Sequence, residues 1–499
     1  MANSANSLRS LASAVSGRLE GLPDDTDALI FDVTHDSRQV SHGSLFVAIL
    51  GHQLDGHEFV RQAVDQGASA LCVEHSTDVA SPQLLVQDTR MALGSLAAAV
   101  HGDPSRDVKV IGVTGTNGKT TVTHYIESLA GSAGLHTGLI GTIHTKIGQT
   151  ILDAVHTTPE ASDFQRLLAR MRDTGVDLVA AEVSSHALEL GRVNATRFAV
   201  AGFTNLSQDH LDFHGDMDHY LSAKRRLFDE YEIGTAVINI DDPVGLQIAN
   251  SFPGEVLTVG REGQCRHSAV QVGVGGTAFT FDTPWGSAEV STPVVGRFNV
   301  FNALMAASCS LAAGIEFDDV VSGLPDMAGV PGRYEIVSGE DPITVVVDYA
   351  HTPDGIAEAI IAARELAGQR VIAVVGAGGD RDRDKRPLMG EAVSSADIVV
   401  VTSDNPRSEA PEDIVASVVS GLEKTVVSIV EVDRLRAIRR AVSVAEDGDI
   451  VLVLGRGHEP FQEVSGMRVA FDDRQVATEA LQLVRRSADL DIDSGSMKP

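Results

Sequence analysis

Short β-branched strands that alternate with helical stretches constrain the fold of this chain most strongly. Such apolar runs recur at residues 108–113, 178–183, 199–203, 236–240, 343–347, 371–375, 398–402 and 450–454. Strands that are almost continuously apolar are typical of parallel sheets covered by helices on both faces. The pattern therefore predicts an α/β protein.

The chain has 499 residues, which is too long for one hydrophobic core. A polar joint at 104–106 and a Gly/Pro joint at 327–333 each precede a new series of strands. We therefore predict three domains, with boundaries near residues 103 and 332. The tail from about residue 487 is expected to be disordered, because it is polar and rich in Asp.

The charge balance excludes some function classes. Lys and Arg number 39 against 69 Asp and Glu, a net charge of −30, which repels nucleic acid and anionic lipid. No apolar run approaches the roughly 18 residues that cross a bilayer, so we expect a cytoplasmic protein without membrane insertion. The three cysteines, Cys72, Cys265 and Cys309, lack metal-ligand spacing and are expected to be buried.

A glycine-rich turn between a strand and a helical stretch is the clearest functional motif. The sequence TGTNGKTT occupies 114–121, and we expect the helix from Val122. Such a turn aims backbone N–H groups at an anion, Lys119 can reach terminal phosphates, and the Thr120 hydroxyl can bind Mg²⁺. The motif predicts an ATP or GTP site, although Val113 stands where the strict phosphate-loop spacing has glycine. The candidate nucleotide-binding residues are Gly115, Thr116, Asn117, Gly118, Lys119, Thr120 and Thr121.

Polar residues follow the strands of the middle segment. EVSSH occupies 182–186 and NLSQDHLD occupies 205–212. Ligands of open α/β sheets bind at the carboxyl ends of the strands. Carboxylate and imidazole groups beside a triphosphate loop suit a divalent ion, so Glu182 and His210 are predicted metal ligands.

Four polar clusters follow the strands of the last segment. They hold both signs of charge, which suits a zwitterion, because arginine binds a carboxylate bidentately while Asp and Glu bind an ammonium group. Pro406 stiffens the turn that presents Asn405 and Arg407, which favours recognition over chemistry. The clusters are DYAH at 348–351, GAGGDR at 376–381, SDNPR at 403–407 and GRGHE at 455–459.

Together these motifs resemble the Mur ligases, ATP-dependent enzymes that add amino acids to the UDP-N-acetylmuramoyl peptide precursor of the bacterial cell wall. The resemblance covers nearly the whole chain and is greatest to members that add diaminopimelate. Further matching motifs are DSR at 36–38, GSLFVA at 43–48, DGH at 55–57, HTTPE at 156–160, AKR at 223–225, GRFN at 296–299 with Asn302, and PGR at 331–333.

The resemblance implies a fold, an activity and ligands. The fold would have a UDP-binding α/β domain over 1–103, a central ATP-binding phosphate-loop domain over 104–332 and a C-terminal Rossmann-like domain over 333–499. The activity would be an ADP-forming ligation of meso-diaminopimelate to UDP-N-acetylmuramoyl-L-alanyl-D-glutamate through an acyl phosphate. ATP and Mg²⁺ would be required, and we expect a monomer.

The resemblance also assigns roles to residues. Lys224 matches the lysine that the family carbamylates, and a carbamate is a carboxylate-like Mg²⁺ ligand. Lys119, Glu182, His210 and Lys224 would form the catalytic set, and Thr120, Glu182, His210 and Lys224 the metal ligands. The precursor would be held by Ser37, His52, Gln53, Leu54, Thr157, Thr158, Ser184 and Arg192. The nucleotide site would be completed by Asn302, Arg333, Asp348 and His351, and the amino acid would be held by Arg381, Asp404, Asn405, Pro406, Arg407, Gly455 and Glu459.

Several alternatives remain open at this stage. Lysine-adding relatives lack the arginine that matches Arg407, which could pair with the second carboxylate of diaminopimelate, but L-lysine stays an alternative substrate. A folyl-polyglutamate type of ligase and a nucleotide-gated sensor without turnover are further alternatives.

Two positions depart from the family pattern, since Leu190 replaces a common glutamine and Ala377 a common cysteine. Either His210 or His351 could be the general base that deprotonates the substrate amine.

Overall fold

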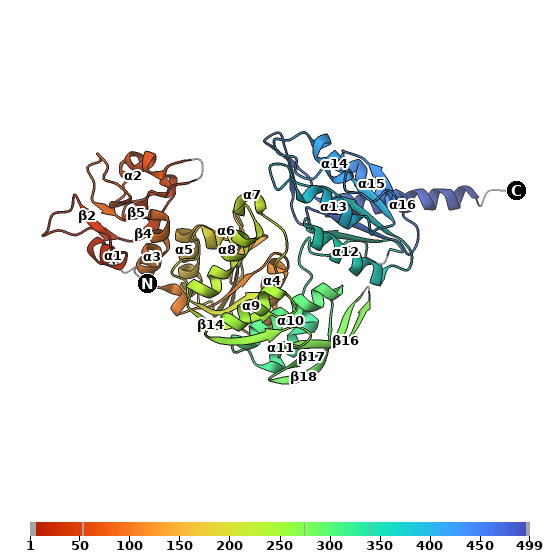
Figure 1. The fold of residues 1–499 in the computed structure, drawn as a ribbon, viewed down its shortest axis with the longest axis horizontal. Coiled ribbons are helices and arrows are strands. Elements are labelled where there is room, and N and C mark those ends of the chain that lie inside the picture. The colour runs from red at the N-terminus through yellow and green to blue at the C-terminus, as the bar shows by residue number, and fades with distance from the viewer. Residues whose placement is uncertain (1–5, 52–53, 274, 340, 496–499) are drawn as a thin grey trace.

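The computed structural model arranges the chain as three segments, each built around its own sheet (Figure 1). The structure describes residues 6–51, 54–273, 275–339 and 341–495. The N-terminal segment lies at one end of the long axis in red and orange, the central segment follows in yellow and green, and the C-terminal segment lies at the other end in teal and blue. Helix α16 (Asp473–Gly495) projects away from the other two segments.

The N-terminal segment has a five-stranded sheet in the order β2-β7-β6-β5-β4, parallel except for edge strand β2. Alternate residues of a strand face opposite sides, so Leu45 and Val47 pack towards α1 and α3 while Phe46 packs towards α2. The elements are β1 (Asn6–Ser7), α1 (Leu8–Ala14), β2 (Arg18–Glu20), β3 (Leu29–Ile30), β4 (Asp32–Thr34), β5 (Ser44–Val47), α2 (Val60–Asp65), β6 (Ala70–Val73), β7 (Gln83–Leu85) and α3 (Thr89–His101).

The central segment has an eight-stranded sheet in the order β11-β10-β9-β12-β8-β13-β14-β15. Its last six strands are parallel, while β10 and β11 form an antiparallel edge. Helices α4 and α10 share one apolar core with the sheet, and α5, α8 and α9 share the core of the opposite face. The elements are β8 (Lys109–Thr114), α4 (Lys119–Ser132), β9 (Thr137–Ile140), β10 (His144–Ile147), β11 (Thr150–Asp153), α5 (Ala161–Asp173), β12 (Leu178–Glu182), α6 (Ser185–Glu189), β13 (Phe198–Phe203), α7 (Leu211–His214), α8 (Met217–Glu230), β14 (Ile233–Asn239), α9 (Pro243–Ser251), β15 (Glu255–Val259), α10 (Arg297–Ala312) and α11 (Phe317–Gly323).

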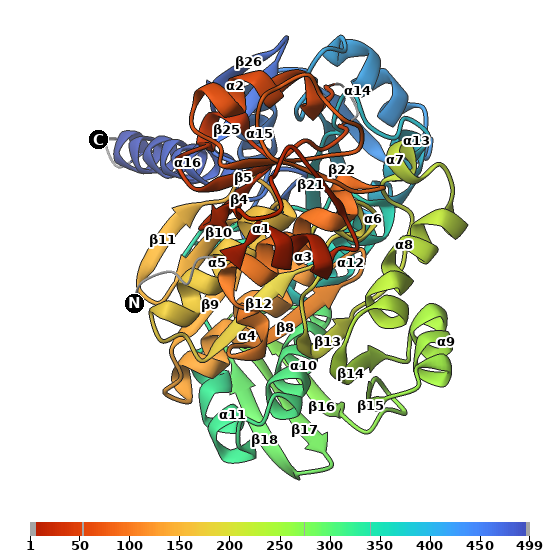
Figure 2. The ribbon, with the colours of Figure 1, turned by 90° about the vertical axis from the view of Figure 1, so that its left-hand side faces the viewer.

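A separate three-stranded antiparallel sheet belongs to the central segment. It consists of β16 (Arg266–Gly273), β17 (Gly276–Thr283) and β18 (Gly286–Thr292). It lies beside α11 at the bottom of Figure 2, on the side of the central segment away from the N-terminal segment.

The C-terminal segment has a six-stranded sheet in the order β19-β20-β24-β21-β22-β23, parallel except for β19. Helices α12, α13 and α14 share the core of one face, and α15 and α16 share the core of the other. The elements are β19 (Glu335–Ile336), β20 (Thr344–Asp348), α12 (Pro353–Leu366), β21 (Val371–Val375), α13 (Lys385–Val393), β22 (Ile398–Val401), α14 (Pro411–Val419), β23 (Val427–Val430), α15 (Arg434–Ser443), β24 (Ile450–Leu454), β25 (Phe461–Val464), β26 (Met467–Ala470) and α16.

The α/β class is confirmed, and all eight predicted apolar runs are strands of parallel ladders. The three cysteines are buried and unpaired, as expected. No helix in the described part of the chain is both long enough and apolar enough to span a bilayer.

Two local predictions differ from the structure. Helix α4 begins at Lys119 rather than Val122, because the turn ends at Gly118 and Lys119 and Thr120 already form the first helical turn. Helix α16 continues to Gly495, whereas the tail was expected to be disordered from about residue 487. Residues 487–494 contain neither proline nor glycine, so no helix-breaking residue interrupts this stretch, and the helix ends at Gly495.

Candidate active site

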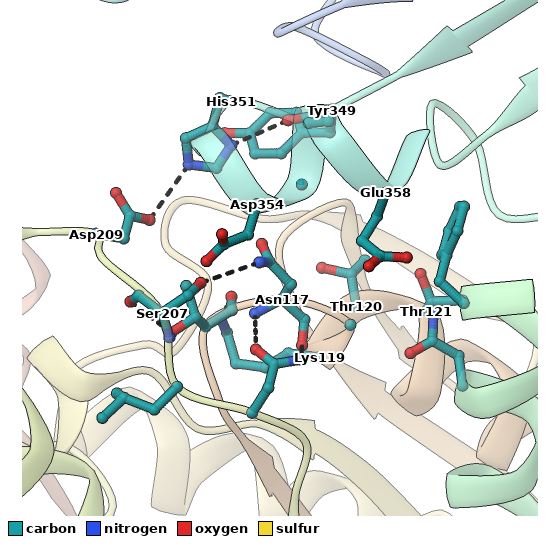
Figure 3. A pocket seen from close by; sticks show the side chains of 18 of the residues that line it. Asn117, Lys119, Thr120, Thr121, Ser207, Asp209, Tyr349, His351, Asp354 and Glu358 are labelled. Atoms are coloured by element: carbon teal, nitrogen blue, oxygen red, sulfur yellow. Dashed lines mark hydrogen bonds and ion pairs between the residues drawn. The ribbon is translucent and has the colours of Figure 1, made fainter. Parts of the chain in front are cut away.

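A cavity of about 560 Å³ lies between the central and C-terminal segments (Figure 3). Its walls come from the loop before α4, the ends of β12 and β13, helix α8, the start of α10 and the loop between β20 and α12. Among the predicted site residues, the cavity is lined by Thr116, Asn117, Gly118, Lys119, Thr120, Thr121, Thr157, Glu182, Ser184, His210, Lys224, Asn302, Arg333, Asp348 and His351.

The glycine-rich turn is shaped to hold an anion. Gly118 caps α4 with a φ of 88° and without a side-chain hydrogen bond, so its geometry leaves the first N–H groups of the helix to a ligand. A Cβ at Gly118 would lie 2.6 Å from Oδ1 of Asn302, so a side chain does not fit there. Nζ of Lys119 folds back and donates to the carbonyls of Gly115 and Thr116, both at 2.8 Å.

Glu182 lies directly beside the first turn of α4. Its Oε2 accepts hydrogen bonds from the hydroxyls of Thr120 (2.9 Å) and Thr142 (3.1 Å), and its Oε1 accepts one from the backbone N–H of Thr142 (2.7 Å). Nη2 of Arg333, from the C-terminal side of the cavity, donates to Thr120 Oγ1 at 3.1 Å. Thr120 and Glu182 therefore present oxygen ligands, the type that Mg²⁺ prefers, at the mouth of the turn.

Lys224 is a fully buried lysine next to the same turn. Its Nζ donates to the carbonyl of Gly115 at 2.6 Å and lies 4.4 Å from the centre of the Tyr220 ring. Burial, together with the neighbouring charge of Lys119, lowers the pKa of Lys224 well below its usual value. This shift favours the neutral amine, which is the form that reacts with CO₂.

Asp209 connects the central and C-terminal segments. Its carboxylate lies 3.0 Å from Nζ of Lys385 and 3.4 Å from Nε2 of His351, and it faces His351 across the cavity in Figure 3. Asp209 and Lys385 are both less than 10% exposed. Burial acts against the charged carboxylate, but the contacts with His351, His210 and Lys385 hold the pKa of Asp209 well below its usual range.

His210 lies near this carboxylate rather than in a complete metal centre. Its Nε2 is 3.3 Å from Asp209, and burial lowers its pKa to about 2, so the ring is neutral at physiological pH. Within the described residues, no group of three or more His, Cys, Asp and Glu side chains could hold a metal ion. Glu182 and His210 therefore need further ligands, such as phosphate oxygens or water, to complete a metal site.

The remaining nucleotide-site candidates come from both walls. Asn302 is buried on α10, and its Nδ2 donates to Asn299. Asp348 accepts the backbone N–H groups of Tyr334 (2.6 Å) and Ala350 (2.8 Å), and burial raises its pKa. The guanidinium of Arg333 stacks 4.2 Å from the ring centre of Tyr349.

The residues predicted to bind the UDP-precursor are not gathered in one place, and of these only Thr157 and Ser184 line the cavity among the described residues. Thr158 donates to the carbonyl of Glu182 at 2.7 Å, and Arg192 pairs with Glu160 at 2.9 Å. Leu54 is 64% exposed. Thr157 bonds with Thr142, Ser184 caps α6, and Ser37 donates to Gln62. His52 and Gln53 lie outside the described residues.

The predicted amino-acid cluster is brought together at the ends of β21, β22 and β24. Asn405 Nδ2 donates to Glu459 Oε2 at 2.7 Å, and Arg407 Nη1 donates to the carbonyl of Gly379 at 2.6 Å. A Cβ at Gly455 would lie 2.5 Å from Oδ2 of Asp404, so only glycine allows these two strand ends to approach so closely. The side chain of Arg381 is 54% exposed and lies 3.9 Å from Asp212.

Sequence reasoning missed several residues that the structure places in or beside the cavity, among them Asp209, Lys385 and Thr142. Asp209 stands next to His210 in the sequence, but no local sequence pattern predicted that it would pair with Lys385. Lys385 is 176 positions away from it. Thr142 follows the short strand β9, which was not among the predicted strands.

Family models match the three segments in order. The model described as "Mur ligase family, catalytic domain" matches residues 30–101, "Mur ligase middle domain" matches 113–310, and "Mur ligase, glutamate ligase domain" matches 332–457. A relative from Geobacillus kaustophilus is 45% identical over 458 residues, covering 90% of this chain and 94% of the relative. The chain belongs to the Mur ligase family.

Three further comparisons agree with this membership. The Geobacillus relative and one from Aquifex aeolicus, 43% identical over 90% of this chain and 93% of its own length, are both named UDP-N-acetylmuramoyl-L-alanyl-D-glutamate--2,6-diaminopimelate ligase. A solved structure of a ligase with the same name matches with a TM-score of 0.69 and 32% identity, covering 97% of this chain and 100% of that chain. A MurF structure from Acinetobacter baumannii, at 21% identity and a TM-score of 0.68, shares the fold, covering 97% of this chain and 99% of that chain.

Proposed function

We propose that this chain is the ATP-dependent amide ligase that adds meso-diaminopimelate to UDP-N-acetylmuramoyl-L-alanyl-D-glutamate. The observation that carries the proposal is the pairing of a phosphate loop with a charged amino-acid cluster on a second sheet, in a chain 45% identical to a ligase of that name. We further infer domain boundaries near residues 103 and 332, and a monomer in the cytoplasm.

The proposed reaction has two steps. The γ-phosphate of ATP is transferred to the D-glutamyl γ-carboxylate of the precursor, which gives ADP and an acyl phosphate. The neutral amine of diaminopimelate then attacks the acyl carbon and gives up a proton to a general base, for which His210 and His351 are the candidates. Phosphate leaves and an amide remains. Lys119 and the N–H groups of the turn stabilise the charge on the phosphate during transfer. Arg333 approaches the same position from the opposite wall.

Mg²⁺ fits the donor set beside the phosphate loop in part. Thr120 and Glu182 supply oxygen ligands whose oxygens lie 2.9 Å apart. The amine of Lys224 is not a suitable ligand as it stands, but a carbamate on it would supply carboxylate-like oxygens. Together with His210 these residues would hold the ion. The bound ion would neutralise phosphate charge during transfer.

A phosphate-release assay tests the function directly. Purified protein is given ATP, Mg²⁺ and the UDP-precursor, and each amino acid is offered singly. We expect release with meso-diaminopimelate and none with L-lysine. Release with lysine alone would refute the proposed amino acid but not the ligase class. Nucleotide binding without release under all conditions would support the sensor alternative instead.

Replacing Arg407 with alanine is expected to raise the KM for meso-diaminopimelate by about tenfold to a hundredfold, the scale of a lost charge-assisted hydrogen bond. Arg407 carries a guanidinium group beside the cluster, and a second substrate carboxylate would pair with it. Steady-state kinetics measure the effect, with Arg436→Ala on the exposed face of α15 as the control. An unchanged KM would show that the carboxylate binds elsewhere.

Closure of the C-terminal domain over the central domain is expected to depend on Lys385. Lys385→Met removes the ammonium that pairs with buried Asp209 and leaves this carboxylate with its contacts to His351 and His210. We expect small-angle X-ray scattering of the variant with all ligands to show a larger radius of gyration than for the wild type. Identical scattering profiles would contradict this role.

A further inference from the structure

Three charged side chains are fully buried beneath the strand ends that carry the amino-acid cluster. Arg434, Asp473 and Arg456 each have 0% side-chain exposure. Arg434 binds Asp473 through two contacts, Nε to Oδ1 at 2.8 Å and Nη2 to Oδ2 at 2.6 Å. None of the three is used in the reaction described above. Burying a charged side chain costs free energy unless it is paired, so we asked what role these three residues have.

Arg434 joins two strand ends that are not neighbours. Its Nη2 donates to the carbonyl of Leu454 at 2.9 Å, and its Nη1 donates to the carbonyl of Ser403 at 3.3 Å. Leu454 ends β24 and Ser403 follows β22, and β21 lies between these strands in the sheet. The next residues along the chain are Gly455 and Asp404, which belong to the amino-acid cluster. Arg434 therefore holds the two halves of that cluster at a fixed spacing.

Arg456 is less completely paired. Its Nη2 donates to the carbonyls of Phe461 and Phe471, the latter at 3.3 Å. Its Nε lies 3.7 Å from Oε2 of Glu459, and its Nη1 lies 3.8 Å from Oδ1 of Asp473. Neither nitrogen makes a hydrogen bond within the described part of the chain. Two buried charged donors are thus directed at carboxylates without bonding to them, and one of those carboxylates belongs to the amino-acid cluster.

The charges of this buried group do not cancel. Two guanidinium groups, Arg434 and Arg456, face three carboxylates, those of Asp473, Asp404 and Glu459. Arg407 also acts on Glu459, but its charge is matched by Glu463 at 3.8 Å. One negative charge remains in excess. Among the described residues, the hydrogen bonds to Asp404 and Glu459 use one oxygen of each, Oδ1 and Oε2. The second oxygens and the excess charge suit one ammonium group.

We propose that Arg456 is a positioning residue for the amino-acid substrate: it holds the Glu459 carboxylate in place so that Glu459 and Asp404 together receive one ammonium group of a zwitterion. This inference rests on the proposed function, and it adds a residue that does not itself touch the substrate. Without Arg456 the cluster would carry two excess negative charges, and Glu459 would be free to take up a proton or to turn away.

The surroundings of Glu459 predict how pH acts on this role. Burial and the adjacent Asp404 raise the pKa of Glu459, while the amide of Asn405 and the charges of Arg456 and Arg407 act in the opposite direction. Arg434 also acts on Glu459 electrostatically. Removal of the Arg456 charge would raise the pKa of Glu459 further. A protonated Glu459 cannot pair with an ammonium group, so affinity for the amino acid would fall at acid pH and recover as the pH rises.

The test compares Arg456→Met with Arg456→Lys. Methionine fills similar space without charge, and Asp473 keeps Arg434 as its partner, so the fold is expected to persist. For Arg456→Met we expect a rise of about tenfold or more in the KM for meso-diaminopimelate. We also expect kcat, and the KM for ATP and precursor, within about twofold of wild type, because Arg456 does not touch the reacting atoms. The acid limb of kcat/KM for the amino acid should move to higher pH.

Arg456→Lys keeps a positive charge and should restore most of the affinity and the wild-type acid limb. Arg439→Met, at an exposed position on α15, is the control and should behave as wild type. A KM and an acid limb unchanged in Arg456→Met would overturn the proposal, as would equal losses of kcat and melting temperature in both Arg456 variants. Absence of wild-type turnover with meso-diaminopimelate would refute the proposed function instead. Calorimetric binding of the same amino acid to the wild type and Arg456→Met would then still decide the role of Arg456.

Discussion

Lys119→Ala is expected to reduce turnover by about a hundredfold to a thousandfold while leaving precursor binding intact. The lysine lies in the first turn of α4, and its ammonium is held at the turn by the carbonyls of Gly115 and Thr116. An alanine there removes the only positive side chain of the turn, although the backbone N–H groups remain. Phosphate release measures turnover, and calorimetry with the UDP-precursor measures binding.

The control for this substitution is Lys424→Ala. Lys424 is exposed and lies after α14, in the C-terminal segment. It should leave both measurements unchanged. Wild-type turnover in Lys119→Ala would contradict the assignment of the phosphate loop, and equal loss of precursor binding would indicate a general structural defect rather than a role at the phosphates.

Lys224→Ala is expected to lower kcat by at least about a hundredfold, comparable to the loss of a group that stabilises the transferred phosphate. The lowered pKa of Lys224 favours its neutral amine, which can add CO₂ and release a proton to give a carbamate. The carbamate would present oxygens, in place of a cation, to the cavity that Thr120 and Glu182 also line. Wild-type kcat should therefore also fall in buffer depleted of CO₂ and recover when bicarbonate is added.

Lys224→Arg separates charge from carbamate formation. Arginine keeps the positive charge but does not form the carbamate under these conditions, so it should be as inactive as alanine. Thermal unfolding shows whether each variant is folded, since the site is fully buried. Full activity of Lys224→Arg, or a wild-type rate that is indifferent to CO₂, would show that Lys224 acts as a buried cation.

Local sequence patterns were sufficient for the α/β class and for eight strands of the parallel ladders, but not for the N-terminal sheet or the sheet of β16 to β18. The run at 371–375 is β21 and the run at 450–454 is β24, because each is short, rich in β-branched residues and apolar at every position, as is typical of a strand buried on both faces. The phosphate loop was equally visible, since a strand, a glycine-rich turn and a helix start are contiguous. The start of α4 was misplaced by three residues because the polar residues Lys119 to Thr121 mask the helical periodicity.

The amino-acid cluster shows where sequence reasoning reaches its limit. Residues at the carboxyl ends of parallel strands were expected to meet, and Asn405 does bond to Glu459 across 54 positions. The sequence did not indicate what lies beneath them. Arg456 stands in the GRGHE motif, but nothing in that motif marked it as buried. Arg434 and Asp473 belong to no motif, and Arg and Asp are mostly exposed in proteins.

The sequence by itself determined the α/β class, the phosphate loop and the family resemblance, because each depends on residues that are close together or on motifs in a fixed order. Only the tertiary structure decided which distant charges are paired, such as Asp209 with Lys385 and Arg434 with Asp473. These pairs matter for stability because they are buried, and a charge removed from water needs an opposite charge nearby. Which charges are buried depends on how whole segments pack together, and no local sequence pattern predicts that packing.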